Sequence, residues 1–330
     1  MSQQHGPEQS VFESEPHTRG VDTPKDRKPP KNLFDGMVKA MRPKQWVKNV
    51  LVVAAPAAAG TEALTDSRTL LDVAIAFITF CFAASSIYLI NDARDVEADR
   101  AHPTKRFRPI AAGVLPVGLA YAMAVILIVL AIGLSFLASS GSGLAIVVAV
   151  YIALQLGYCF GWKHLPVIDI ALVSSGFMLR AMAGGVAAGI TLSQWFLLVM
   201  AFGSLFMAAG KRYSELLLAQ ATGAKIRKSL QGYTDTYLRF VWTLAGTAVV
   251  LTYALWGFEM SNTAHIDGQA VWYQLSMVPF TVAILRYALD VDRGEGGAPD
   301  ELAYSDRVLQ ILALAWVACM AMAVYVIPAL

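Results

Sequence analysis

The chain has 330 residues, of which 56% are hydrophobic and only 15% are charged, and its formal net charge is +2. A soluble domain usually carries about 25% charged residues, so this composition excludes an ordinary soluble domain and indicates a membrane protein with several spans. So small a net charge implies no nucleic-acid partner. Cys81, Cys159 and Cys319 all lie in apolar stretches, which predicts buried apolar residues without a disulfide framework.

The N-terminal segment differs in composition from the rest of the chain. Residues 1–32 are rich in Pro, Glu, Lys, Ser and Gln and hold few large apolar residues, which predicts a disordered tail. No early apolar stretch marks a cleavable signal peptide. Residues 33–42 then place apolar side chains at helical spacing beside Lys39 and Arg42, which predicts a short helix on the membrane surface.

Beyond this segment, long apolar stretches alternate with polar connections. A helix of about 20 apolar residues crosses a bilayer, so each stretch near that length is a candidate span. The stretches lie at residues 45–60, 69–91, 116–138, 142–161, 167–189, 193–210, 237–257, 270–289 and 308–328. The first is short and is interrupted by Pro56. We therefore predict an all-α, polytopic membrane protein, a bundle of about nine transmembrane helices.

The distribution of Lys and Arg predicts the orientation of the bundle. These residues crowd the N-terminal segment and the connections after the second, fourth, sixth and eighth spans, whereas the opposite connections hold almost none apart from Arg68. Cytoplasmic connections carry such an excess of positive charge. We therefore expect a multi-pass protein of the cell membrane whose N-terminus and larger polar connections face the cytoplasm.

Three aspartates directly follow the second apolar stretch. Asp92, Asp95 and Asp99 are three and then four residues apart, and Asn91 precedes them. On one continuous helix they would share a face within roughly 60° of arc, where their charges repel unless a cation lies among them. Carboxylates with room for water suit Mg²⁺, which also binds substrate phosphates. A cationic stretch follows, formed by Arg100, His102, Lys105, Arg106 and Arg108. The segment predicts a site for a metal ion and a diphosphate.

A second polar cluster lies between the fourth and fifth spans. It consists of Tyr158, Trp162, Lys163, Pro166 and Asp169. Eleven residues beyond Asp169, Arg180 returns to nearly the same helix face, about 16 Å deeper in the membrane. An arginine at that depth usually faces a partner or a polar cavity. Arg180 is therefore either a structural residue paired with a distant carboxylate or a residue that binds an anionic group inside the bundle.

Two further basic segments lie at the ends of spans. One follows the sixth span and contains Lys211, Arg212, Tyr213 and Glu215. Membrane anchoring explains the two cations but not Tyr213 and Glu215, and phosphate binding is the alternative. The other segment places Lys44, Lys48 and Asn49 at the start of the first span, where they either anchor the helix at the interface or hold a phosphate.

The segment at 91–113 carries a family resemblance. It reads Asn-Asp-x-x-Asp-x-x-x-Asp followed by His-Pro-x-Lys-x-x-Arg-Pro-Ile-Ala-x-Gly, which resembles the first signature of the UbiA superfamily of intramembrane prenyltransferases. The resemblance implies that residues 33–330 form a transmembrane catalytic domain. Members of this superfamily commonly carry a second motif, Asp-x-x-x-Asp, but here Asp169 is followed four residues later by Val173. The missing acid argues against transfer of a prenyl group to an aromatic ring.

Together with residues 42–49 and 211–215 and with Lys163 beside Asp169, this segment resembles the phosphoribosyltransferase branch of that superfamily. The resemblance implies transfer of 5-phosphoribosyl from phosphoribosyl diphosphate (PRPP) to decaprenyl phosphate with release of diphosphate, in the supply of arabinose donors for cell-wall polysaccharides. The alternative is a prenyltransferase that moves a prenyl group from prenyl diphosphate to an aromatic acceptor. A transporter would place charges deep in several spans, whereas these acids lie at span ends.

The resemblance also implies roles for individual residues. Asn91, Asp92, Asp95 and Asp99 would hold Mg²⁺, with Asp92, Asp95, Asp99 and Asp169 in catalysis. The residues expected to bind substrate are Lys44, Lys48, Asn49, Lys105, Arg108, Tyr158, Lys163, Arg180, Lys211, Arg212, Tyr213 and Glu215. No general base is required, because a phosphate monoester is largely dianionic at neutral pH. Assembly into a homo-oligomer stays open.

Overall fold

The computed structural model describes residues 28–222, 230–264, 266, 268–294, 302 and 305–329. All regular secondary structure in these ranges is helical, which confirms the predicted all-α class. The tail predicted to be disordered lies mostly outside the described residues.

The N-terminal half consists of long helices separated by short ones. Its elements are α1 (Leu33–Met41), the 3₁₀ helix η1 (Pro43–Val53), α2 (Ala54–Ala58), α3 (Thr61–Thr65), α4 (Ser67–Arg94), α5 (Val96–Arg100), the 3₁₀ helix η2 (Lys105–Phe107), α6 (Val117–Ser135), α7 (Ser142–Cys159), the 3₁₀ helix η3 (Trp162–His164) and α8 (Ile168–Ala187). The C-terminal half contains α9 (Gln194–Thr222), α10 (Asp235–Thr263), α11 (Gln269–Asp292), α13 (Arg307–Ala321), the π-helical turn η5 (Met322–Val326) and α14 (Ile327–Ala329).

Seven helices of the described residues are long and apolar enough to cross a membrane, which makes the chain a multi-pass membrane protein. They are α4, α6, α7, α8, α9, α10 and the α13–α14 segment. The eighth predicted span corresponds to α11, whose 24 residues also suffice in length. The first predicted span is not one continuous α-helix, because residues 43–58 form η1 and the five-residue α2.

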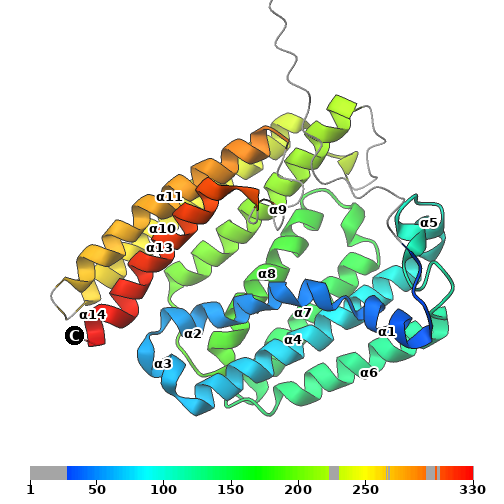
Figure 1. Ribbon diagram of the computed structural model, residues 1–330, viewed down its shortest axis with the longest axis horizontal. Helices are drawn as coiled ribbons and strands as arrows, with labels where there is room; N and C mark the ends of the chain where they lie inside the picture. The colour runs from blue at the N-terminus through cyan, green and yellow to red at the C-terminus, as the bar shows by residue number, and fades with distance from the viewer. Residues whose placement is uncertain are drawn as a thin grey trace, which may run out of the picture.

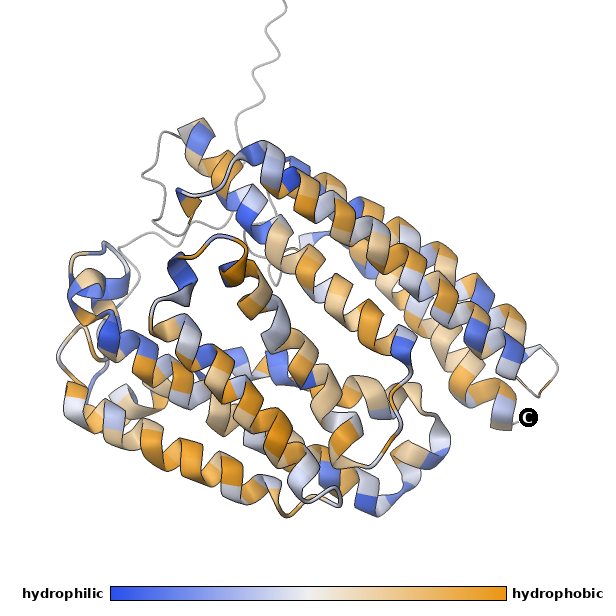
Figure 2. Ribbon diagram, turned by 180° about the vertical axis from the view of Figure 1, so that it is seen from behind, coloured by the Kyte–Doolittle hydropathy of each residue, from blue (hydrophilic) through white to orange (hydrophobic). Residues whose placement is uncertain are grey.

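The long helices form two groups that meet along α8 and α9 (Figure 1). Helices α4, α6 and α7 pack together with η1 alongside, and α10, α11 and α13 form the second group. Each group has its own buried apolar core. The outer helix α6 is hydrophobic along most of its length (Figure 2), and its exposed residues include Val125, Ile126 and Val129, as expected of a surface that faces lipid.

One close approach and one turn fix the positions of η1 and α1. The α-carbon of Gly184 in α8 lies so near η1 that a β-carbon there would come within 1.7 Å of the Val52 carbonyl oxygen. Arg42 links α1 to η1 in the left-handed conformation, with φ 55°. This turn directs η1 along the bundle and leaves the Arg42 side chain near the end of α4.

Candidate active site

Asp92 and Asp99 lie on either side of one arginine. Both residues are only 3% exposed. Nη1 of Arg108 donates to Asp92 Oδ1 at 3.1 Å and to Asp99 Oδ2 at 2.7 Å. Nη2 of Arg42 also donates to both oxygens of Asp92, at 2.7 and 2.6 Å, and Lys105 Nζ lies 3.9 Å from Asp99. Residues from three separate segments of the chain therefore meet at the end of α4.

Asp95 points to a different cation. Its two carboxylate oxygens accept from Lys163 Nζ at 2.9 and 2.8 Å, and Asn91 Oδ1 lies 3.5 Å from the same nitrogen. The expectation that the three aspartates share one helix face is wrong, because α4 ends at Arg94 and Asp95 has non-helical φ and ψ of −89° and 11°. The chain restarts as α5, so Asp95 turns toward η3 while Asp92 and Asp99 turn toward Arg108.

We call Asn91, Asp92, Asp95 and Asp99 the acid cluster. Its three carboxylates face four cations, from Arg42, Lys105, Arg108 and Lys163. Across the part of the chain that the structure describes, three or more His, Cys, Asp or Glu side chains nowhere gather closely enough to ligate a metal. The donors are nevertheless all oxygen, the type that Mg²⁺ prefers, so the residue set fits Mg²⁺ by its chemistry. For Mg²⁺ to bind these carboxylates, Arg108 and Lys163 would have to release them.

A second cluster forms around Arg212 of α9. Its Nε lies 3.3 Å from Asp169 Oδ2, and its Nη1 donates to Glu215 Oε2 at 3.2 Å. The Tyr158 hydroxyl also contacts this guanidinium. Two acids therefore do meet here, but the second is Glu215 of α9 and not a residue four positions after Asp169. Val173 holds the position of the second acid of the motif in α8, and Glu215 of α9 supplies the second carboxylate that contacts Arg212.

Asp169 is completely buried, so its carboxylate is not exposed to a substrate in solution. The Tyr233 hydroxyl donates to Asp169 Oδ1 and accepts from the Val167 backbone N–H at 2.5 Å. Burial raises the pKa of Tyr233, and the hydrogen bond to Asp169 raises it further. The phenol therefore stays protonated and can donate. The structure thus places Asp169 behind Arg212, where it can orient the guanidinium.

Arg180 and Asn49 bind each other inside the bundle. Arg180 Nε donates to Asn49 Oδ1 at 2.8 Å, and its other nitrogens donate to the Gly176 carbonyl at 2.6 Å and the Tyr151 hydroxyl at 2.9 Å. The partners are neutral, so the predicted distant carboxylate is not what pairs with Arg180. These bonds join η1, α7 and α8, and neither residue is carried into the proposed reaction.

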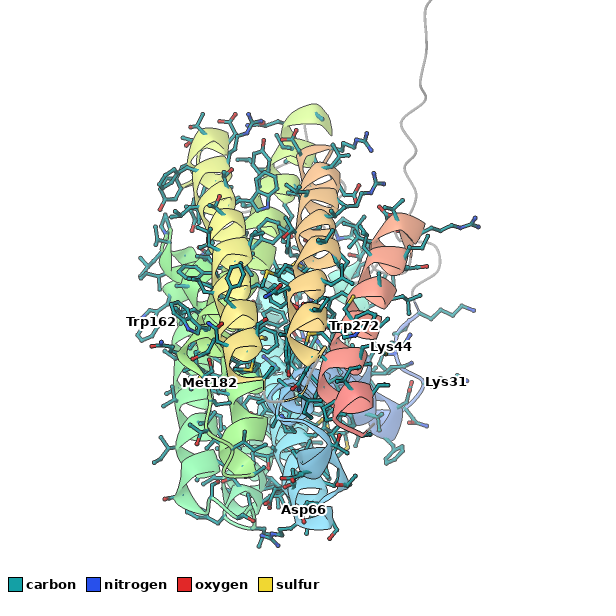
Figure 3. The ribbon with its side chains drawn as sticks, turned by 90° about the vertical axis from the view of Figure 1, so that its left-hand side faces the viewer. Lys31, Lys44, Asp66, Trp162, Met182 and Trp272 are labelled. Carbon is teal, nitrogen blue, oxygen red and sulfur yellow. The ribbon has the colours of Figure 1, made fainter. Side chains whose placement is uncertain are left out.

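The other candidate substrate ligands divide by exposure. Lys44 and Lys211 are exposed and Lys48 is half-buried. In Figure 3 the labelled Lys44 and Trp162 lie on opposite sides of the view, and the segments that carry them supply Arg42 to Asp92 and Lys163 to Asp95. Tyr213 is fully buried and accepts a hydrogen bond from Arg239 Nε at 2.8 Å, so it packs toward α10 and not toward the acid cluster.

The structure adds Arg42 and Tyr233 to the residues predicted from sequence. Arg42 lies in the basic segment before the first span and could have been included on that ground. Tyr233 lies 64 residues from Asp169 in a connection without a recognisable motif, so no local signal identifies it.

Comparison with known proteins identifies the family of this chain. Residues 50–305 match the UbiA prenyltransferase family, and the chain belongs to that family. It is 72% identical over 327 residues to the decaprenyl-phosphate phosphoribosyltransferase of Corynebacterium glutamicum, covering 99% of this chain and 98% of that protein. It is 59% identical over 299 residues to the protein of the same name from Mycobacterium tuberculosis, covering 90% and 96%.

A solved structure shares the fold. The UbiA homolog from Archaeoglobus fulgidus bound to GPP and Mg²⁺ superposes with a TM-score of 0.64 over 87% of this chain and 98% of that chain, at 14% identity. At that identity the likeness establishes the fold alone. The predicted helical bundle of UbiA type is confirmed.

Proposed function

We propose that this protein transfers a 5-phosphoribosyl group from PRPP to decaprenyl phosphate and releases diphosphate. The observation that carries the proposal is the acid cluster with its four surrounding cations, because both substrates are phosphorylated anions. The near-full-length identity to the two phosphoribosyltransferases supports the same choice of substrates.

Asn91, Asp92, Asp95 and Asp99 are the residues that would hold Mg²⁺ on the diphosphate of PRPP. When bound, the metal ion neutralises the negative charge that grows on the leaving diphosphate. Arg108 and Lys163 bridge the acid cluster in this structure and are placed to bind the donor phosphates once the carboxylates take the metal. Arg42 and Lys105 add positive charge beside them, and an arginine can grip a phosphate through two parallel hydrogen bonds.

We assign the acceptor phosphate to the second cluster and the nearby lysines. Arg212 is held by Asp169 and Glu215, and Lys211 lies next to it on α9. Lys44 and Lys48 supply further cations from η1. The acceptor phosphate has a second pKa of about 6 and is already a nucleophile at neutral pH, so the site needs only to bind and orient it.

The isoprenoid tail of the acceptor would occupy an apolar cavity of about 390 Å³. It lies between α2, α9, α10 and α13, and its lining includes Ala57, Phe196, Tyr253, Trp316 and Met320. Because η1 runs from Arg42 at the acid cluster to Ala54 at this cavity, one short helix connects the charged and apolar regions. About 11 residues of 3₁₀ helix span roughly 20 Å, a distance of several isoprene units.

We place the acid cluster on the cytoplasmic side of the cell membrane. The positive-inside rule assigns to that side the basic connections after α4 and α7 and the end of α9 that carries Lys211 and Arg212. There, soluble PRPP and Mg²⁺ can reach the site, while the lipid acceptor enters from the bilayer.

Two labelled donors test the proposal in membranes that contain the protein. One reaction receives labelled PRPP with decaprenyl phosphate, and the other receives labelled prenyl diphosphate with an aromatic acid acceptor, each with Mg²⁺. We expect Mg²⁺-dependent label in the lipid phase from PRPP only. Label transferred from the prenyl donor alone would overturn the proposal in favour of the aromatic prenyltransferase.

Matched variants link the reaction to the site. Asp92→Asn keeps the shape of the side chain but weakens a metal ligand, so we expect it to abolish transfer nearly completely. Asp35→Asn alters a half-buried aspartate of α1 that pairs with Lys39 away from the acid cluster, and it should leave the rate unchanged. Full activity of Asp92→Asn would remove the metal assignment.

A further inference from the structure

We propose that Tyr233 is a positioning residue of this enzyme, which fixes Asp169 and through it the phosphate-binding guanidinium of Arg212. The inference rests on the proposed function, because it takes Arg212 to bind a substrate phosphate. Tyr233 belongs to the connection before α10. Its hydroxyl contacts Val167 and Asp169 at the start of α8, and these contacts are what allow it to position Asp169.

The Tyr233 hydroxyl makes two hydrogen bonds in the segment that begins α8. It accepts from the Val167 N–H and donates to the Asp169 carboxylate two residues further on. Val167 has φ 70°, a conformation that is strained for a β-branched residue and is held by surrounding contacts. Next to Tyr233, a β-carbon on Gly232 would come within 2.6 Å of Pro166, so the two connections are in close contact.

Asp169 transmits this constraint to Arg212. Its Oδ1 accepts from Tyr233, and its Oδ2 makes no hydrogen bond among the described residues but lies 3.3 Å from Arg212 Nε. Because Asp169 is fully buried, water cannot replace a lost partner. Without the Tyr233 hydroxyl, the carboxylate would rotate to use both oxygens on Arg212, and the guanidinium would shift from its present place beside Glu215.

The first experiment compares Tyr233→Phe with Tyr237→Phe in purified protein. Tyr237 stacks on Tyr233 with ring centroids 6.0 Å apart, and its hydroxyl is free of hydrogen bonds within the described ranges. We expect Tyr233→Phe to lower kcat/KM about ten- to hundredfold, chiefly through a higher KM for the phosphorylated substrate that Arg212 binds. Tyr237→Phe should retain the wild-type KM and melting temperature. An unchanged KM in Tyr233→Phe would overturn the inference.

A double-mutant cycle separates positioning from general stabilisation. Arg212→Lys removes the planar guanidinium that Asp169 orients. If Tyr233 acts through Arg212, adding Tyr233→Phe to Arg212→Lys lowers kcat/KM by less than threefold further. If the two losses multiply in full, Tyr233 serves only the fold and the inference is wrong.

Asp169→Asn covers the case in which Tyr233→Phe does not fold. The amide oxygen still accepts from Tyr233, but the charge that holds Arg212 is lost. We expect a raised KM together with a lower melting temperature, because the buried ion pair with Arg212 is broken, and a wild-type KM would contradict the inference. Wild-type turnover with PRPP tests the proposed function separately, since only the ratios between variants bear on Tyr233.

Discussion

Arg108 provides a sharp test of whether the acid cluster binds a cation. Its Nη1 is shared by Asp92 and Asp99. Within the described residues, Arg108→Gln therefore leaves Asp99 with Lys105 alone, 3.9 Å away, while Asp92 keeps Arg42. Removing one partner of a buried ion pair costs about 3–5 kcal/mol. Because the Arg108 side chain is 26% exposed, we expect the low end of that range, about 3 kcal/mol. The carboxylates that lose Arg108 become better ligands for Mg²⁺.

The two effects predict a melting curve that depends on Mg²⁺. Without Mg²⁺, a loss of about 3 kcal/mol in a chain of 330 residues corresponds to a drop of roughly 4 °C in melting temperature. Mg²⁺ at one hundred times its dissociation constant restores about 2.7 kcal/mol and hence most of that drop. Thermal unfolding in detergent, with EDTA or with Mg²⁺, measures both values.

The matched control is Arg106→Gln, two residues away. Arg106 is exposed and stacks on the neighbouring Phe107 ring, with 4.9 Å from its guanidinium carbon to the ring centroid. It should melt like the wild type in EDTA and in Mg²⁺. If Mg²⁺ fails to raise the melting temperature of Arg108→Gln above its value in EDTA, the acid cluster is not a magnesium site.

Three further changes test other parts of the structure. Gly184→Ala brings a β-carbon within 1.7 Å of the Val52 carbonyl oxygen and should destabilise the bundle by about 3 kcal/mol. In the control Gly118→Ala the new β-carbon has no atom within 4 Å, so this variant should melt at or above the wild-type temperature. Equal melting temperatures of the two variants would refute the close packing of η1 on α8. Lys163→Gln should raise the KM for PRPP at least tenfold without lowering the melting temperature by more than a few degrees, and a wild-type KM would exclude Lys163 from donor binding. Val167→Gly relieves the strain of φ 70° and should stabilise the protein by about 1 kcal/mol in chemical unfolding, so a destabilised variant would show that Val167 is not strained.

Sequence patterns predicted the helical bundle because apolar stretches of span length leave few other folds in a membrane. They also located the acid cluster, since closely spaced carboxylates at a span end are rare. They did not predict that the cluster divides between Arg108 and Lys163, because no Gly or Pro marks the end of α4 at Arg94. The hydrophobic pattern alone gives a continuous helix there.

Contacts between segments distant in the sequence explain the remaining differences between the predictions and the structure. Glu215 and Asp169 share Arg212, although Asp169 lies at the start of α8 and Glu215 lies near the end of α9. Tyr233 reaches Asp169 from a connection without a motif. The first predicted span was expected to be short and interrupted by Pro56, and most of it is a 3₁₀ helix that packs closely against Gly184 of α8.

The most direct test is a structure determined with PRPP and Mn²⁺, an electron-rich substitute for Mg²⁺. We predict a metal ion at about 2.1–2.2 Å from carboxylate oxygens of Asp92 and of Asp95 or Asp99, bridging to the diphosphate of PRPP. Arg108 and Lys163 should then have moved from the carboxylates to phosphate oxygens. A donor bound elsewhere, with Arg108 still between Asp92 and Asp99, would contradict it.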